Sequence, residues 1–127
     1  MTEPVGFTAM TTDTLTYNED DVIEFPLAMS NFGGYYNPAS GLFTCPYDGI
    51  YMFFNSIRSD SSDVDCYMHR ESSILLHMFS LRDASRSNLV ITRCNRGERV
   101  WARQQYDNYV IEGSHSTMFS GFLLYKY

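Results

Sequence analysis

The sequence predicts an all-β protein, a sandwich or jelly roll of about ten short strands. Aromatic residues, which favour strands, make up 16% of the chain. Short apolar segments alternate with turn signals, and no long segment has the period of a helix. A length of 127 residues suits one domain. We therefore expect a tail over residues 1–4 and a single domain over residues 5–127.

Each expected strand stops at a turn signal or a polar loop. Pro26 ends one strand, Gly33-Gly34 and Asn37-Pro38 mark a turn-rich segment, and residues 95–98 have the Asn-X-Gly pattern of a hairpin turn. Two further polar segments, residues 11–21 and 106–114, are expected to be loops. The expected strands are residues 5–10, 22–25, 42–45, 50–57, 64–69, 74–81, 89–94, 99–104 and 117–125.

Two of these strands are apolar on both faces. Residues 50–54 and 122–125 contain only apolar and aromatic residues, whereas a strand with one solvated face alternates. A strand buried on both faces of a small sandwich needs a further layer, and another copy of the chain is the simplest one. The sequence therefore predicts an obligate oligomer. The candidates for the core and for contacts between copies are Tyr51, Phe53, Phe119, Gly121, Phe122, Leu123 and Tyr125.

The composition excludes some functions. The net charge is -6 and there is no basic stripe, which argues against nucleic-acid binding. No apolar run approaches about 18 residues, so no membrane span is expected. The basic residues are eight Arg and one Lys. Since Arg suits buried interfaces and carboxylates, this excess indicates either contacts between copies of the chain or a ligand that carries a carboxylate.

Three cysteines leave at least one thiol unpaired. Cys45 follows an apolar strand and is expected to be a buried small hydrophobe. Cys66 and Cys94 can form one disulfide, although the spacing does not select this pair. Cys66 and His69 have the spacing of a zinc half-site, but on a strand they point to opposite faces, and no second half-site follows.

No catalytic arrangement emerges from the sequence. His69, His77 and His115 have no nucleophile at a suitable spacing. Asp107 and Glu112 could act as paired carboxylates, but nothing organises them into a cleft. The chain is therefore not expected to be an enzyme.

Several short motifs occur in the order and at the spacing of a known family. They are residues 5–9, Asn31, Gly34, Tyr36, Asn37, Gly41, residues 43–46, residues 49–51, Phe53, residues 97–101 and residues 119–124. Through them the chain resembles the globular-head domain of the complement C1q family, which shares its fold with the tumour necrosis factor cytokines. The resemblance implies a ten-stranded jelly roll that forms a tight trimer. Within that fold, Gly121 is expected to allow close approach of a neighbouring backbone.

The segment 103–112 is the preferred ligand surface, because its composition resembles that of sugar-binding sites. Tyr rings offer apolar faces to sugar C–H groups, amides and carboxylates bind hydroxyls, and Arg103 could bind a sialic acid carboxylate through two hydrogen bonds. The alternative is that Tyr106 and Tyr109 pack across the trimer seam. Trp101, within a strand, is expected to be structural. The ligand candidates are Arg103, Gln105, Tyr106, Asp107, Asn108 and Tyr109.

The resemblance also suggests a metal ion near the trimer apex, although no cofactor is required. Acidic loop residues supply the hard oxygen ligands that calcium prefers. Asp83 lies in the corresponding region, and Asp63 and Asp65 would share one face of a strand. Solvated acidic side chains are the alternative at each position.

These observations lead to a function by resemblance. The first hypothesis is a secreted pattern-recognition lectin of innate immunity that binds cell-surface or microbial glycans, sialic acid above all, as a homotrimer. The alternatives are a protein-receptor ligand similar to tumour necrosis factor and an extracellular, calcium-associated matrix protein.

Overall fold

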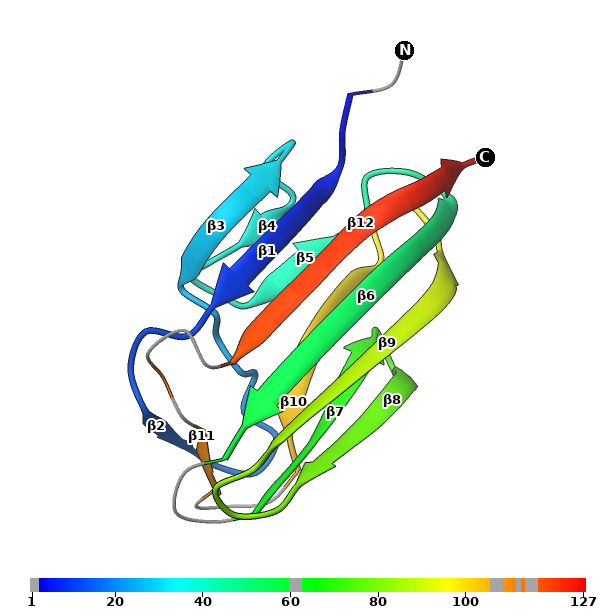
Figure 1. Cartoon of the computed structure of the whole chain (residues 1–127). Coiled ribbons are helices and arrows are strands. Elements are labelled where there is room, and N and C mark those ends of the chain that lie inside the picture. Colours follow the sequence, from blue (N-terminus) through cyan, green and yellow to red (C-terminus); the bar gives the residue numbers. More distant parts are fainter. Residues whose placement is uncertain (1–2, 60–62, 106–108, 112, 114–116) are drawn as a thin grey trace.

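A computed structural model describes residues 3–59, 63–105, 109–111, 113 and 117–127 of the chain. These residues form strands, turns and loops, so none of them belongs to a helix able to cross a membrane. Two five-stranded antiparallel sheets face each other, and a two-stranded sheet lies at one end of the molecule (Figure 1). The all-β prediction is confirmed.

Both large sheets join strands that are distant in sequence. The first sheet has the order β3 (Leu27–Phe32), β1 (Gly6–Met10), β12 (Met118–Lys126), β6 (Gly49–Arg58) and β9 (Ser85–Cys94). The second sheet has the order β4 (Tyr36–Asn37), β5 (Leu42–Thr44), β10 (Arg99–Gln104), β7 (Val64–Arg70) and β8 (Ser73–Ser80). The small sheet pairs β11 (Tyr109–Ile111) with β2 (Leu15–Tyr17).

The core lies between the two large sheets and is rich in aromatic rings. Along β6 every second residue is buried, so Tyr51 and Phe53 point into the sandwich. The ring of Phe7 stacks on Tyr36 at 4.6 Å and meets the edge of Phe119 at 4.8 Å. Burial of each such side chain contributes about 1.5–3 kcal/mol, and favourable ring geometry about 0.5–1.5 kcal/mol more.

Three strands were not predicted from the sequence. Strand β3 follows Pro26 and is an edge strand, where a preceding proline costs no hydrogen bond of the ladder. Strands β2 and β11 have three residues each and pair across almost the whole chain, Leu15 with Ile111. The expected strand at residues 22–25 is reduced to a single bridge from Val22 to Arg103.

Gly121 is required for a different reason than expected. A side chain at this position would place its Cβ 2.6 Å from the Phe53 ring and 3.0 Å from the Phe7 ring, so two core side chains, and not a backbone, occupy the space. The close backbone approach occurs at Gly49 instead, where a Cβ would meet the carbonyl oxygen of Tyr125.

Candidate functional site

The outer face of the second sheet carries a group of polar and aromatic side chains at its centre. On β10 and β7, Val100, Ala102, Cys66 and Met68 point into the core, which leaves the alternate residues half-buried on the outside. We name these outer residues, with one from β8, the Arg103 surface. Its members are Tyr67, His69, His77, Trp101 and Arg103.

The strand register brings the members of the Arg103 surface into contact. Trp101 lies opposite His69, and Tyr67 lies between Arg103 and His77. The rings of His69 and Trp101 stack at 5.5 Å, and those of Tyr67 and His77 at 4.5 Å. The Arg103 guanidinium carbon lies 5.1 Å from the centre of the Tyr67 ring. Cross-strand pairs of this kind stabilise a sheet by about 0.2–1 kcal/mol each.

Arg103 is already engaged by neighbours in its own chain. Its Nε donates to His69 Nε2 at 2.9 Å, and one terminal nitrogen donates to Gln105 Oε1 at 3.1 Å. The other terminal nitrogen is 2.5 Å from Asp20 Oδ1, in an ion pair. The fork expected to be open to a ligand carboxylate therefore holds Asp20, which is 71% exposed and so displaceable.

The hydrogen bond from Arg103 fixes the protonation state of His69. Because Nε2 accepts from the guanidinium, this nitrogen carries no proton, and Nδ1 is the nitrogen that faces the carbonyl oxygen of Glu71 at 3.3 Å. Burial lowers the pKa of His69 from its usual value, and the charge of Arg103 lowers it further. The imidazole is therefore neutral at physiological pH.

The predicted ligand loop is described only at its two ends. Gln105 lies next to Arg103, as expected, and Tyr109 belongs to β11, where its backbone is opposite Tyr17. Tyr106, Asp107 and Asn108 lie outside the described residues. The expectation that Trp101 is buried structure is only half right, since Trp101 lies on the outer face and stacks on His69.

The alternation of the strands could have revealed the rest of the Arg103 surface. It places Tyr67 and His69 on one face of β7 and Trp101 and Arg103 on one face of β10. The position of Asp20 carried no comparable signal, because it depends on a contact between residues 83 positions apart.

The arginine excess serves contacts within the chain in part. Arg70 is 3.8 Å from Glu98, and Arg99 binds the Glu71 carboxylate through two nitrogens at 3.0 and 3.1 Å. The hydrogen bonds from Arg99 lower the pKa of Glu71.

The three calcium candidates have partners or positions that do not converge on an ion. Asp63 accepts a hydrogen bond from the backbone N–H of Arg82 at 2.8 Å, and Asp65 pairs with His77. Asp83 has a φ of 58° in the turn between β8 and β9. Among the described residues, no group of three or more His, Cys, Asp and Glu side chains is placed to hold a metal ion.

The cysteines are arranged differently from the pair considered above. All three are free and buried, and Cys94 is hydrogen-bonded to Cys45 and not joined to Cys66. Cys66 points into the core while His69 points outward, as predicted for two residues three apart on a strand.

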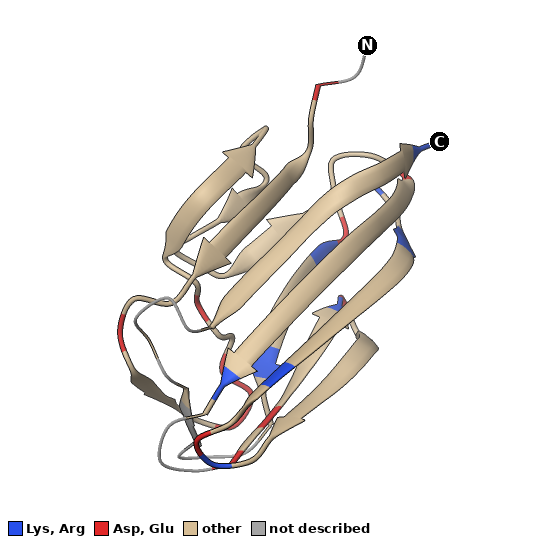
Figure 2. Cartoon of the chain, viewed as in Figure 1, with Lys and Arg blue, Asp and Glu red and all other residues tan. Residues whose placement is uncertain are grey.

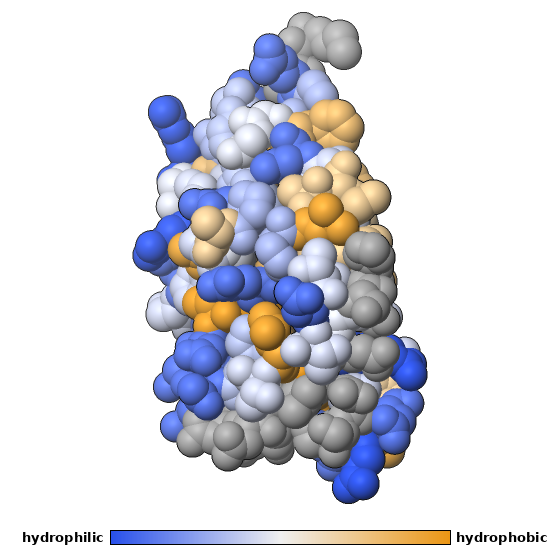
Figure 3. Space-filling view, turned by 90° about the vertical axis from the view of Figure 1, so that its left-hand side faces the viewer, coloured by the Kyte–Doolittle hydropathy of each residue, from blue (hydrophilic) through white to orange (hydrophobic). Residues whose placement is uncertain are grey.

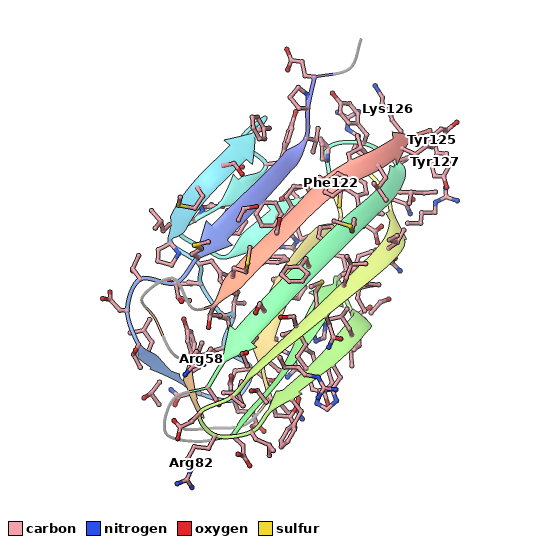
Figure 4. All side chains as sticks on the ribbon, viewed as in Figure 1. Arg58, Arg82, Phe122, Tyr125, Lys126 and Tyr127 are labelled. Atoms are coloured by element: carbon pink, nitrogen blue, oxygen red, sulfur yellow. The ribbon has the colours of Figure 1, made fainter. Side chains whose placement is uncertain are left out.

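The candidates for the core and for contacts between copies divide into two sets. Tyr51, Phe53 and Phe119 are fully buried with Gly121 in the sandwich, and Leu123 packs partly against them. Phe122 and Tyr125 are instead exposed on β12, as Figure 4 shows. The exposed set belongs to a wider outer surface of the first sheet.

We call this surface the apolar face, and it is almost free of charge. The register aligns Phe122, Met52 and Ile91 in one row across three strands, and Phe54 and Leu89 in the next. Figure 2 shows that the charged residues of β6 and β12 are confined to the strand ends. They are Arg58 and Lys126. The apolar face comprises Phe32, Met52, Phe54, Leu89, Ile91 and Phe122.

A shallow groove crosses the apolar face. It has a volume of about 330 Å³ and lies over Gly6, which has Phe32 on one side and Phe122 on the other in the strand register. Other sides of the molecule differ: the side that carries β2, β3 and β4 has separate hydrophobic patches within a mostly hydrophilic surface (Figure 3).

Comparison with known proteins gives the family. The family model described as C1q domain matches residues 6–124. One polypeptide of the mouse complement C1q subcomponent is 36% identical over 123 residues, which cover 91% of this chain and 49% of that polypeptide. The chain thus spans about half the length of this relative.

Solved structures of the same architecture extend the similarity. The globular domain of zebrafish complement 1qA protein aligns with 97% of this chain and 99% of its own, at a TM-score of 0.81 and 18% identity. Eiger, a tumour necrosis factor from S. frugiperda, aligns with 99% of this chain and 96% of its own, at a TM-score of 0.75 and 12% identity. The protein has the jelly-roll fold shared by C1q and tumour necrosis factor domains, and the chain belongs to the C1q domain family. This assignment agrees with the expectation that the chain is not an enzyme.

Proposed function

We propose that the chain is the ligand-binding head of a secreted pattern-recognition protein, which assembles as a homotrimer and binds acidic glycans, sialic acid above all. The observation that carries the glycan proposal is the pair of Arg103 with the exposed carboxylate of Asp20. Asp20 occupies the position in which a ligand carboxylate would bind the guanidinium, so the site is preformed for that group.

The neighbours of Arg103 suit a ligand rich in hydroxyl groups. Gln105 offers an amide, Asp65 a carboxylate and Trp101 an indole N–H within one face. The faces of Tyr67 and His77 cover each other, so contacts to a sugar come from ring edges and polar groups more than from stacking on these two rings.

The apolar face supports the homotrimer. Exposed hydrophobic residues on this scale mark a surface that associates with another protein, and charge is missing from its centre. The groove over Gly6 offers a recess for a side chain of a neighbouring copy. Three copies of a weak site on one trimer gain avidity when they engage the same cell surface.

The glycan proposal is tested on an array of sialylated and desialylated probes, with and without calcium. The wild-type trimer is expected to bind sialylated probes selectively, and Arg103→Ala is expected to abolish this binding. Arg99→Ala is the matched control, because it removes the same charge from the other end of β10. Equal binding by Arg103→Ala and the wild type, or silence across the whole array, would overturn the proposal.

A protein receptor is the second candidate, and one observation favours it. Ile74 and Phe79 on β8 and Leu81 just after it are exposed hydrophobic residues near the edge of the second sheet, away from the apolar face. A nanomolar protein partner whose binding is lost in Phe79→Asp, together with silence on the glycan array, would support this function instead.

A further inference from the structure

Two buried cysteines face each other at the junction of the two large sheets. Cys45 directly follows β5 of the second sheet, and Cys94 is the last residue of β9 of the first sheet. Both side chains are completely buried, and their thiols form a hydrogen bond. This pair has no role in the Arg103 surface or the apolar face.

The backbone holds the two cysteines together from both sides. The N–H of Cys45 donates to the carbonyl oxygen of Glu98, and the N–H of Gly97 donates to that of Cys45, both at 2.8 Å. Cys94 in turn lies opposite Gly49, four residues after Cys45. Each cysteine is thus tied to the turn next to the other, so the sulfur contact is fixed by main-chain pairing.

The surroundings favour a thiolate at Cys94. The hydrogen bond from the Cys45 thiol lowers the pKa of Cys94, and the nearby Arg70 guanidinium acts in the same direction against the effect of burial. Arg70 is held there by a hydrogen bond to Thr92 Oγ1 at 2.8 Å and by another to the carbonyl oxygen of Arg93. The same thiol contact, together with burial, raises the pKa of Cys45.

We propose that Cys45 and Cys94 form an intramolecular disulfide when the chain folds in an oxidising environment, and that Cys66 stays a free thiol. Cys66 lies on β7 opposite Met78, apart from the pair. The bond would join the two sheets next to the turn between β9 and β10. It would add a covalent link where the structure now has a hydrogen bond.

The oxidant is a small-molecule disulfide such as oxidised glutathione. The Cys94 thiolate attacks one sulfur of the reagent, forms a mixed disulfide and releases one glutathione thiolate. Cys45 then loses its proton and attacks the Cys94 sulfur, which forms the Cys45–Cys94 bond and releases the second thiolate. The protein loses two electrons and the thiol protons, and the reagent gains them as two thiols. Because both sulfurs are inaccessible in the folded domain, the exchange takes place on the folding chain.

Trypsin separates the three cysteines, which makes the pairing directly measurable. Cleavage after Arg58, Arg70, Arg93 and Arg96 places Cys45 in peptide 1–58, Cys66 in peptide 59–70 and Cys94 in peptide 94–96. The full chain is refolded in a glutathione redox buffer, denatured at low pH and alkylated with N-ethylmaleimide before digestion. The expected result is alkylation of Cys66 alone and a cross-link between peptides 1–58 and 94–96.

Two variants and a stability measurement complete the test. Cys66→Ser is expected to keep the cross-link, and Cys94→Ala to lose it. Reduction should lower the melting temperature of the wild type by about 10 °C, because the bond closes a long loop, and should not lower that of Cys94→Ala. Alkylation of all three cysteines after oxidation, a link that includes peptide 59–70, or a link between chains would each overturn the proposal. If Cys94→Ala does not fold, the wild type and Cys66→Ser still decide the result.

Discussion

Arg103 donates a hydrogen bond from Nε to Nε2 of His69, over 2.9 Å. The bond exists only while the imidazole is neutral, because a proton on Nε2 would face the N–H of a permanently charged guanidinium. The arrangement of the Arg103 surface is therefore linked to pH.

Acidification is expected to destabilise the protein through His69. Its pKa in the folded state lies below the unfolded value of about 6.5, mainly because of burial. Its contribution to stability is therefore complete above the unfolded pKa, and is lost as the pH falls from there towards the folded pKa. Urea unfolding at pH 7.5 and pH 5.5 should show a smaller loss in His69→Gln than in the wild type, since an amide can still accept from Arg103. His77→Gln, which removes a histidine from the same surface, is the control, and equal losses in both variants would contradict the prediction.

Removal of the charge on Asp20 is expected to strengthen ligand binding. In Asp20→Asn the intramolecular competitor for Arg103 is weakened, and an exposed ion pair of this kind is worth about 0.2–1 kcal/mol, which is about a one-and-a-half- to fivefold gain in affinity. Titration of a sialylated oligosaccharide followed by calorimetry measures the change. A loss of affinity in Asp20→Asn would mean that Asp20 holds Arg103 in place for the ligand instead of competing with it.

Assembly is expected to depend on the apolar face. The wild type should have about three times the 14.7 kDa mass of the chain in light scattering. Ile91→Asp should dissociate the trimer, because a charge would be buried without a partner at the interface. Ile91 is 59% exposed in the single chain, so folding should be preserved. Ile74→Asp on β8, at a residue that is 56% exposed, is the matched control and should leave the trimer intact.

Enlargement of Gly121 should disturb the core. The new methyl group of Gly121→Ala would overlap the Phe53 ring, 2.6 Å from the ideal Cβ position. Overpacking of this kind costs about 1–3 kcal/mol of unfolding free energy, measurable as a lower denaturation midpoint in guanidinium. An unchanged midpoint would show that Phe53 and Phe7 can move aside.

The hydroxyl of Tyr36 should stabilise the fold measurably. It donates to the carbonyl oxygen of Phe25 at 2.8 Å in a fully buried position. In Tyr36→Phe this acceptor loses its partner, which should cost about 1–3 kcal/mol by denaturant unfolding. Tyr35→Phe, at a half-buried neighbour, should have little effect, and similar costs for both variants would argue against a special role for the buried hydroxyl.

Sequence patterns predicted the parts of this molecule that depend on neighbours along the chain. The strand at residues 99–104 was placed with its observed bounds, and β6 differs by one residue at each end, because both alternate and end at clear turns. Strand β3 and the β2–β11 pair were missed, since edge position and pairing between distant short segments leave little local signal.

The candidate site was predictable only in part for the same reason. Arg103 and Gln105 were identified by residue type, but the contacts that define the surface come from the register of β10 with β7 and of β7 with β8. The partner of Cys94 was likewise not readable from spacing, because it depends on how the turn after β9 meets the end of β5.

The antiparallel pairing of β1 with β12 brings the first and last strands of the domain out at one pole, where the N–H of Leu123 donates to the carbonyl oxygen of Val5 at 3.0 Å. The β2–β11 sheet, next to the far end of β10, lies at the opposite pole (Figure 1). A biosensor surface, a fluorescent fusion partner or an affinity tag attached to either terminus would therefore leave the opposite pole facing solution. The same proximity makes the domain a good host for circular permutation, in which a short linker joins the old termini and new ends are opened in a distant turn.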